Sequence, residues 1–353
     1  MEMKQLWLAA PGKTELRTVP VPQPGKGELL IKVEAALTCG TDLKAWRRGH
    51  SLIPMPGPFG HEFSGTVAAA GRNVKKFRPG DAVMAVHTAP CRRCYYCKKG
   101  VYNLCRKIMD TKVLGAFGEY LLLPRHIVNT NTFLKPKNLS FEEAAFLEPL
   151  SCVVHGVERL LRGKTGAGDR ALVFGAGPIG LMHLVLLKAR GVKVAVCALE
   201  ASRLALAKKV LGADAVFRPE NPNKKSDAGE GAKKAMNEFA PMGADYVIEC
   251  TGRKEVWQSA PEYVRRGGRI MLFGGLEAGA QVHWPAHMIH YDELTLMASF
   301  HFCPADVKKA RRLLAEGKID VKPLISGSCA LSGAGRAFES LARGRGIKYV
   351  IRA

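Results

Sequence analysis

Four cysteines stand close together over residues 91–105 and could bind a metal ion. They are Cys91, Cys94, Cys97 and Cys105, in the pattern Cys-x2-Cys-x2-Cys-x7-Cys. This spacing lets one short loop surround a tetrahedral ion, and four sulfur ligands leave no coordination position open for a substrate. Since the remaining cysteines are scattered along the chain, the pattern favours a structural zinc site over a disulfide framework.

A second, dispersed set of residues has the chemistry of a catalytic zinc site. It consists of Cys39, the neighbours His61 and Glu62, and Glu148 ahead of a proline. A catalytic zinc takes about three mixed ligands and keeps one position for water or substrate. Taken singly, Cys39 could be a buried thiol and His61 a core histidine. Taken together, Cys39, His61 and one of the two carboxylates would supply the three ligands of such a site.

A glycine-rich segment predicts a dinucleotide-binding turn. Residues 175–180 read Gly-Ala-Gly-Pro-Ile-Gly and match G-x-G-x-x-G, with an apolar strand pattern before them and a helical pattern after them. The amino end of that helix would face the pyrophosphate with its positive dipole end. The predicted cofactor contacts of the turn are Gly175, Gly177, Pro178, Ile179 and Gly180.

The residue expected at the adenosine ribose leaves both NAD and NADP open. If Glu200 closes the second strand, its carboxylate can accept hydrogen bonds from the ribose hydroxyls, which favours NAD. If Ala198 holds the strand end, no carboxylate opposes a 2′-phosphate, and Ser202 or Arg203 could receive it. Glu200 and Arg203 are therefore both candidate cofactor contacts.

The first 150 residues or so read as short strands with turns. Strand patterns occur at 29–35, 63–70 and 81–87, and turn signals separate them. Ser140 and Glu143 have the spacing of a capping box, which predicts the start of a helix. This part of the chain is therefore expected to be β-rich and barrel-like.

Strands and helices alternate in the middle of the chain. The strand patterns are at 170–174, 193–199, 245–250 and 269–273, and the helical patterns between the first of them are at 179–190 and 202–211. Such alternation predicts a doubly wound parallel sheet in an α/β protein. The polar stretch 219–231 is expected to be a surface loop, and a further helix is expected over 305–316.

Length and composition fit two globular domains. The chain has 353 residues, of which 47% are hydrophobic and 24% charged, which excludes a disordered chain. No apolar run reaches the ~18 residues that span a bilayer, and the first residues lack the apolar region of a signal peptide. We therefore expect a cytoplasmic protein with no membrane partner.

The net charge of +22 raises the alternative of a zinc-containing nucleic-acid binder. Lys and Arg are spread over the whole chain, and aromatic residues make up only 7% of it. A non-catalytic zinc or nucleic-acid-binding protein would also leave the glycine turn without a role. We therefore expect no nucleic-acid partner.

Taken together, these motifs resemble the zinc-dependent medium-chain dehydrogenase/reductase (alcohol dehydrogenase) family from one end of the chain to the other. Residues 60–74 follow the family's zinc signature, Gly-His-Glu-x2-Gly-x5-Gly-x2-Val. Residues 39–42, the four cysteines and the glycine turn occur in the family's order. Residues 148–155, Glu-Pro-Leu-Ser-Cys-Val-Val-His, are most similar to sorbitol or polyol dehydrogenases, with threonine dehydrogenases next.

The resemblance implies a GroES-like catalytic domain over 1–153 and 295–353, which includes the zinc lobe 91–105. The Rossmann domain would occupy 154–294. It also implies two zinc ions per chain and a homodimer or homotetramer. The implied reaction is hydride transfer between a small secondary alcohol or polyol and NAD or NADP, which gives the ketone. L-threonine or another amino-alcohol is the alternative substrate.

Roles for individual residues also follow from the resemblance. Cys39 and His61 would ligate the catalytic zinc, Glu62 and Glu148 would share the remaining carboxylate role, and Thr41 would begin a proton relay.

The outer residues of the implied site depart from the usual pattern at one position. Asp42 would orient the site, and Lys348 would contact the cofactor phosphates. Lys44 stands where many relatives have the histidine that ends the relay. A lysine could still pass a proton, so Lys44 is included among the candidate catalytic residues.

Overall fold

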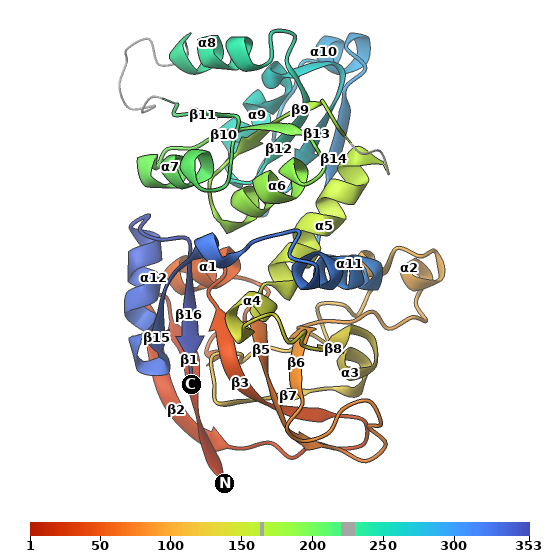
Figure 1. Ribbon diagram of the computed structural model, residues 1–353, viewed down its shortest axis with the longest axis vertical. Coiled ribbons are helices and arrows are strands. Elements are labelled where there is room, and N and C mark those ends of the chain that lie inside the picture. Colours follow the sequence, from red (N-terminus) through yellow and green to blue (C-terminus); the bar gives the residue numbers. More distant parts are fainter. Residues whose placement is uncertain (163–165, 220–229) are drawn as a thin grey trace. The chain divides into compact units, whose positions relative to one another are not determined.

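The computed structural model describes residues 1–162, 166–219 and 230–353 (Figure 1). Most of the loop predicted over 219–231 therefore lies outside the described residues. The chain forms two compact units: unit 1 is Met1–Ser151 with Phe302–Ala353, and unit 2 is Cys152–His301. Within the described residues, no helix is both long enough and apolar enough to cross a membrane.

The observed unit boundaries differ from the predicted ones at both ends of unit 2. The first boundary follows Ser151 instead of residue 153, and both positions lie within one helix, α5 (Leu147–Leu161). The boundary predicted after residue 294 would separate β14 (Thr295–Ala298) from its neighbour β13 (Val264–Leu272), with which it pairs in parallel. Because ladder hydrogen bonds hold β14 to that sheet, it belongs to unit 2.

Unit 1 is β-rich, as the strand patterns predict, and its strands form two sheets. Its strands are β1 (Glu2–Ala10), β2 (Lys13–Pro20), β3 (Leu29–Leu37), β4 (Gly57–Pro58), β5 (Glu62–Ala70), β6 (Ala82–Val86), β7 (Tyr120–Leu123), β8 (Thr132–Leu134), β15 (Ile325–Ala330) and β16 (Lys348–Arg352). The larger sheet has the order β15-β16-β3-β5-β6-β8, with β7 also paired to β3, and the smaller one has the order β2-β1-β4.

Helices connect the strands of unit 1 and close its core. They are α1 (Gly40–Arg48), α2 (Tyr95–Lys98), α3 (Arg125–Asn131), α4 (Phe141–Ala145), α11 (Pro304–Ala315) and α12 (Ala334–Ala342). The predicted capping box is confirmed at α4, where Ser140 Oγ accepts from the Glu143 amide at 3.2 Å. In the core, the Phe59 ring lies 5.0 Å from that of Phe117 and 5.5 Å from that of Phe338, measured between centroids.

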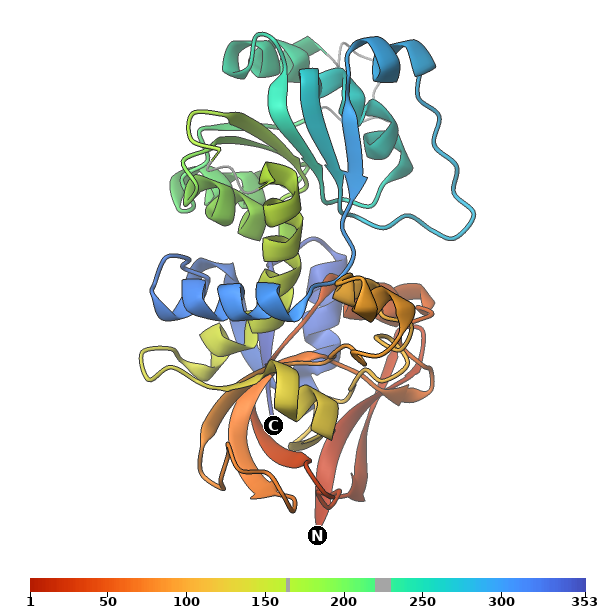
Figure 2. The ribbon, with the colours of Figure 1, turned by 90° about the vertical axis from the view of Figure 1, so that its right-hand side faces the viewer.

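Unit 2 is a parallel sheet with the strand order β11-β10-β9-β12-β13-β14, and helices flank it on both sides (Figure 2). Its remaining strands are β9 (Arg170–Phe174), β10 (Lys193–Cys197), β11 (Ala215–Phe217) and β12 (Ala244–Glu249), and its helices are α6 (Pro178–Lys188), α7 (Ala201–Lys209), α8 (Glu230–Phe239), α9 (Lys254–Ser259) and α10 (Ala286–Tyr291). The predicted doubly wound sheet is confirmed.

One strand of this sheet is shorter than predicted. The strand expected over 193–199 ends at Cys197, because Glu200 is already the N-cap of α7. Ala198 is therefore the first residue beyond β10, at the carboxyl edge of the sheet, where ligands of such folds bind.

Candidate functional site

Pairing of two strands in unit 1 assembles the dispersed zinc-ligand candidates. Cys39 comes shortly after β3, and His61 and Glu62 stand at the start of β5; these strands are antiparallel neighbours with Leu37 opposite Glu62. Ligand atoms of Cys39, His61 and Glu62 all lie within 4.8 Å of one another. A thiol, an imidazole and a carboxyl group at this separation match the donor types of a catalytic zinc site.

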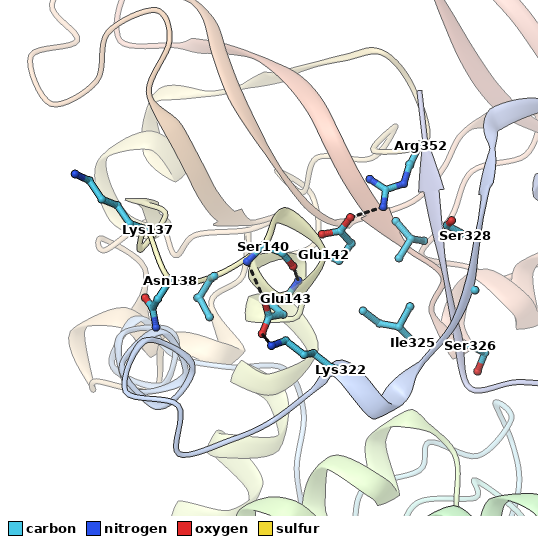
Figure 3. Close-up of a pocket in the computed structure, with 13 residues that line it drawn as sticks. Lys137, Asn138, Ser140, Glu142, Glu143, Lys322, Ile325, Ser326, Ser328 and Arg352 are labelled. Atoms are coloured by element: carbon cyan, nitrogen blue, oxygen red, sulfur yellow. Dashed lines mark hydrogen bonds and ion pairs between the residues drawn. The ribbon is translucent and has the colours of Figure 1, made fainter.

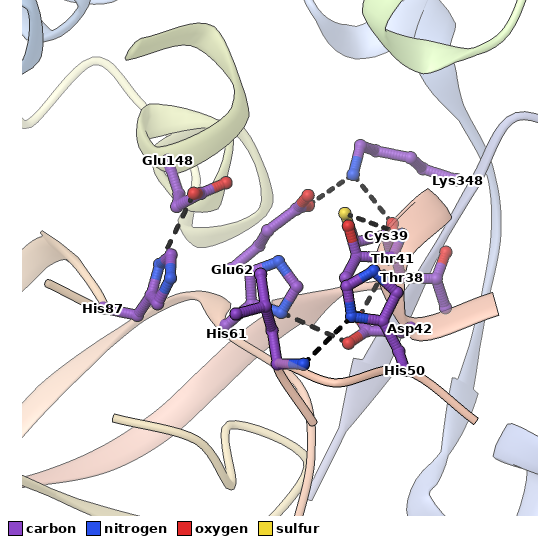
Figure 4. Close-up of polar contacts among 11 residues, drawn as sticks. Thr38, Cys39, Thr41, Asp42, His50, His61, Glu62, His87, Glu148 and Lys348 are labelled. Atoms are coloured by element: carbon purple, nitrogen blue, oxygen red, sulfur yellow. Dashed lines mark hydrogen bonds and ion pairs between the residues drawn. The ribbon is translucent and has the colours of Figure 1, made fainter. Parts of the chain in front are cut away.

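Asp42 orders two of these ligands (Figure 4). Cys39 is the N-cap of α1, and its amide donates to Asp42 Oδ2 at 3.2 Å. The other carboxylate oxygen, Oδ1, lies 3.2 Å from Nδ1 of His61, and Asp42 is fully buried. A carboxylate on one ring nitrogen fixes the imidazole orientation and directs the other nitrogen to a metal. The orienting role predicted for Asp42 is therefore supported by its contacts.

The protonation of these groups fits a site made for a cation. Burial, and next the negative charge of Glu62, raises the pKa of the Cys39 thiol. Burial also raises the pKa of Glu62. For His61, burial opposes the charged ring, but the charges of Asp42 and Cys39 outweigh it and hold the pKa of His61 well above its usual value. A bound Zn²⁺ would favour the deprotonated form of each ligand.

Lys348 contacts Glu62 rather than lying open to a cofactor phosphate. Its ammonium group contacts Glu62 Oε2 and donates to the backbone oxygen of Thr38 at 2.7 Å. Only 1% of Lys348 is exposed, and Glu62 is fully buried. This differs from the predicted contact with the cofactor, because pairing of β16 with β3 draws the residue into unit 1.

In the metal-free protein, Lys348→Met is expected to lower the free energy of unfolding by about 3–5 kcal/mol, because it leaves the buried Glu62 carboxylate without its counter-charge. Urea denaturation of the wild type and the variant measures this loss. The double variant Lys348→Met/Glu62→Gln should recover most of it, since a neutral side chain needs no cation. A loss below about 1 kcal/mol in the single variant would show that Glu62 does not depend on Lys348.

Glu148 lies in the first turn of α5 and contacts a histidine that sequence reasoning missed. Nδ1 of His87 is 3.4 Å from Glu148 Oε1, and both residues are buried. Burial, with the nearby charge of Glu62, raises the pKa of Glu148 to about 7. The His87 ring is 4.9 Å from the His61 ring between centroids. His87 could have been found only from the pairing of β6 with β5. It directly follows Val86, which pairs with Glu62.

The two candidate proton-transfer residues lie on α1. Thr41 follows Cys39 closely, is half-buried, and its amide donates to Cys39 Sγ at 3.4 Å. Lys44 stands about one turn further along the same helix and is also half-buried. Burial, and then the charges of Lys44 and Arg48, lowers the pKa of His50. The relay role of Thr41 and Lys44 stays a prediction.

The four clustered cysteines converge as predicted, in a loop that includes α2. Their ligand atoms lie within 4.8 Å of one another, and Cys91 Sγ is 4.0 Å from Cys97 Sγ. Backbone amides, first that of Cys97, lower the pKa of Cys94 to about 6, whereas burial raises the pKa of Cys97 to about 12. Four sulfur atoms at this separation fit the ligand set of a tetrahedral zinc ion, and a bound ion would favour the thiolate form of each.

The glycine turn of unit 2 has the shape of a pyrophosphate cradle. Gly175 has φ = +101°, and a Cβ on Gly180 would lie 1.8 Å from the Gly175 oxygen. Gly177 is the N-cap of α6, and no described atom lies within 4 Å of where its Cβ would be. Glycine at these positions therefore permits the turn and leaves the backbone open to a phosphate group. Pro178 begins the helix, where a missing amide hydrogen costs nothing.

A separate open pocket in unit 1, about 730 Å³ in volume, lies beside α4, β15 and β16 (Figure 3). Its charged groups are already engaged with each other: Arg352 contacts Glu142, and Lys322 Nζ is 3.6 Å from Glu143 Oε1. Glu143 also caps α4. These groups serve the fold, so the zinc-ligand cluster remains the better candidate for chemistry.

Comparison with known proteins agrees with this arrangement. Residues 25–131 match the family model for the alcohol dehydrogenase GroES-like domain, and residues 178–316 match that for zinc-binding dehydrogenases. D-xylulose reductase A of Aspergillus oryzae is 33% identical over 96% of this chain and 93% of its own length. Sorbitol dehydrogenase of Homo sapiens is 33% identical over 97% of this chain and 93% of its own length.

Solved structures give the same result. A chain described as a zinc-binding dehydrogenase from Sinorhizobium meliloti 1021, bound to NADP, is 31% identical to this one. The superposition covers 100% of both chains with a TM-score of 0.87.

Proposed function

This chain belongs to the zinc-dependent alcohol dehydrogenase family, and on that premise we propose that it transfers hydride between a secondary alcohol or polyol and a nicotinamide cofactor, giving the ketone. The observation that carries the proposal is the convergence of Cys39, His61 and Glu62 within 4.8 Å in unit 1. The glycine turn of unit 2 supports a dinucleotide as the second reactant. The relatives named for sorbitol and D-xylulose support polyols as the first substrates to test.

Each residue of the cluster has a definable task in this reaction. Cys39, His61 and Glu62 would hold the zinc ion, and Asp42 keeps the His61 ring in place. Zinc supplies a Lewis acid and the nicotinamide ring supplies the hydride acceptor when they are bound. The Thr41 hydroxyl then accepts the proton of the substrate hydroxyl and passes it outward.

Two further residues are proposed to handle protons around this cluster. Glu148, with a pKa of about 7, can gain or lose a proton near neutral pH, and its contact with His87 holds it in place. Lys44, further along α1 from Thr41, is the proposed outer end of the relay.

Zinc content and cofactor reduction, measured on the same sample, test the proposed function. We expect two zinc ions per chain, one for each cluster described above, and reduction of NAD or NADP by a polyol or secondary alcohol. The panel contains sorbitol, xylitol, 2,3-butanediol and L-threonine. Light scattering on the same sample tests the predicted homodimer or homotetramer.

Each failure of this experiment has a distinct meaning. Full zinc content without reduction of either cofactor by any alcohol would contradict the proposed reaction. Turnover of L-threonine alone would assign the chain to amino-alcohol oxidation instead. Binding of a single zinc ion would show that one of the two clusters is not a metal site.

A further inference from the structure

Three neighbouring strands of unit 2 bring an arginine beside the position where the cofactor ribose is expected. The strands β11, β10 and β9 lie side by side and parallel, with Phe217, Cys197 and Phe174 in register (Figure 1). The first residues beyond them are therefore neighbours at the carboxyl edge of the sheet. In that order along the edge they are Arg218, Ala198 and Gly175. Gly175 opens the glycine turn, so this edge is the nucleotide-binding edge.

No carboxylate stands at the end of β10. Ala198 takes that position, is 7% exposed, and donates its amide to the Phe217 oxygen at 3.1 Å. In dinucleotide-binding sheets an acidic residue near this place accepts hydrogen bonds from the ribose 2′-hydroxyl of NAD. Glu200 comes two residues later, as the N-cap of α7. A phosphate on the ribose would therefore meet a methyl group rather than a negative charge at the strand end.

An arginine lies next to this position instead. Arg218 is exposed, and its Nε donates to the backbone oxygen of Leu199 at 2.9 Å, which ties its guanidinium to the turn after β10. Among the described residues, Arg218 makes no ion pair with an acidic side chain. Ser202 and Arg203 lie in the first turn of α7, whose amino end favours anions. A guanidinium fork is well suited to a phosphate monoester.

We propose that Arg218, with Ser202 and Arg203, binds the 2′-phosphate of the adenosine ribose, so that this chain selects NADP over NAD. The inference rests on the proposed dehydrogenase function and adds its cofactor preference. Arg218 supplies the guanidinium contact, and Ser202 supplies a hydroxyl donor. Ala198 leaves room and adds no negative charge.

Direct binding tests this site without relying on turnover. NADPH and NADH are titrated into the full chain and followed by the fluorescence of the nicotinamide ring. We expect NADPH to bind at least about tenfold more tightly than NADH. A few charge-assisted hydrogen bonds to the 2′-phosphate are enough to give this difference in affinity. Adenosine 2′,5′-bisphosphate should displace NADPH better than 5′-AMP does, because only the former has the 2′-phosphate.

Variants assign the preference to individual residues. Arg218→Met should weaken NADPH binding about tenfold and leave NADH within about twofold. Ala198→Asp should weaken NADPH about a hundredfold, since a carboxylate would then face the phosphate. The matched control is Arg266→Met, which removes an exposed arginine near the amino end of β13, and it should change neither affinity.

Three results would overturn the inference. These are equal or tighter binding of NADH by the wild type, equal weakening of both dinucleotides by Arg218→Met, or selective loss of NADH binding by Glu200→Gln. The last result would assign the ribose hydroxyls to Glu200. Failure of both dinucleotides to bind the wild type would instead contradict the proposed dehydrogenase. NADPH selectivity without turnover of any tested alcohol would support the 2′-phosphate site and count against the proposed reaction.

Discussion

Cys39→Ser is expected to lower kcat/KM at least about a thousandfold while cofactor binding stays within about twofold of the wild type. The expected loss corresponds to about 4 kcal/mol of transition-state stabilisation, which is reasonable for removing a ligand of the metal that polarises the substrate. Cys39 is also the N-cap of α1, and serine is among the best N-cap residues. The substitution therefore removes a zinc ligand without removing the helix cap.

The same substitution at a second helix cap is the matched control. Cys303 is the N-cap of α11, with Asp306 in the capping box, just as Cys39 has Asp42. Cys303→Ser should therefore keep zinc content, cofactor binding and turnover. His61→Ala should repeat the loss of turnover seen with Cys39→Ser. Near-normal kcat in Cys39→Ser after removal of the metal would contradict the catalytic assignment.

Sequence reasoning found the parts of this site that are encoded locally. The four-cysteine loop, the Gly-His-Glu segment and the glycine turn are each contained in a short stretch, so their spacing alone limits their geometry. The predicted helix start at Ser140 was likewise a local hydrogen-bond pattern and is confirmed. Alternation of strands with helices was enough to predict the parallel sheet of unit 2.

Contacts set by pairing of distant strands were not accessible from the sequence. Lys348 contacts Glu62 because β16 and β5 both pair with β3, although the two residues are 286 positions apart. The register between β6 and β5 brings His87 beside His61, and there His87 also contacts Glu148 of α5. Nothing in the local patterns around these residues indicates such partners.

The end of β10 could not be predicted from the sequence either. The apolar pattern continues past Cys197 to Leu199, so hydrophobicity alone extended β10 by two residues. The helix cap at Glu200 ends the strand earlier, and this leaves Ala198 at the sheet edge. A shift of two residues decides whether an acidic or an apolar side chain stands where the ribose is expected. The cofactor preference could therefore be proposed only with the structure.

The second large effect is expected in the zinc lobe, which we predict to stabilise the fold without taking part in the chemistry. Cys94→Ser should lose one zinc ion per chain, because the four sulfur ligands hold the ion together. We expect the free energy of unfolding to fall by about 3–5 kcal/mol, in the range for loss of a structural metal. Tm should fall by about 6–20 °C, while kcat at 25 °C stays within about threefold of the wild type.

The control is Cys329→Ser, which makes the same substitution in unit 1 outside the lobe. Cys329 is a half-buried thiol in β15 and belongs to neither zinc-ligand cluster. This variant should keep its full zinc content and lose far less stability than Cys94→Ser does. If Cys94→Ser kept its full zinc content, the lobe would not be the second metal site. If it lost turnover and kept its Tm, the lobe would act on the reaction rather than on the fold. That result would contradict a structural role, because an ion with no open coordination position cannot bind the substrate directly.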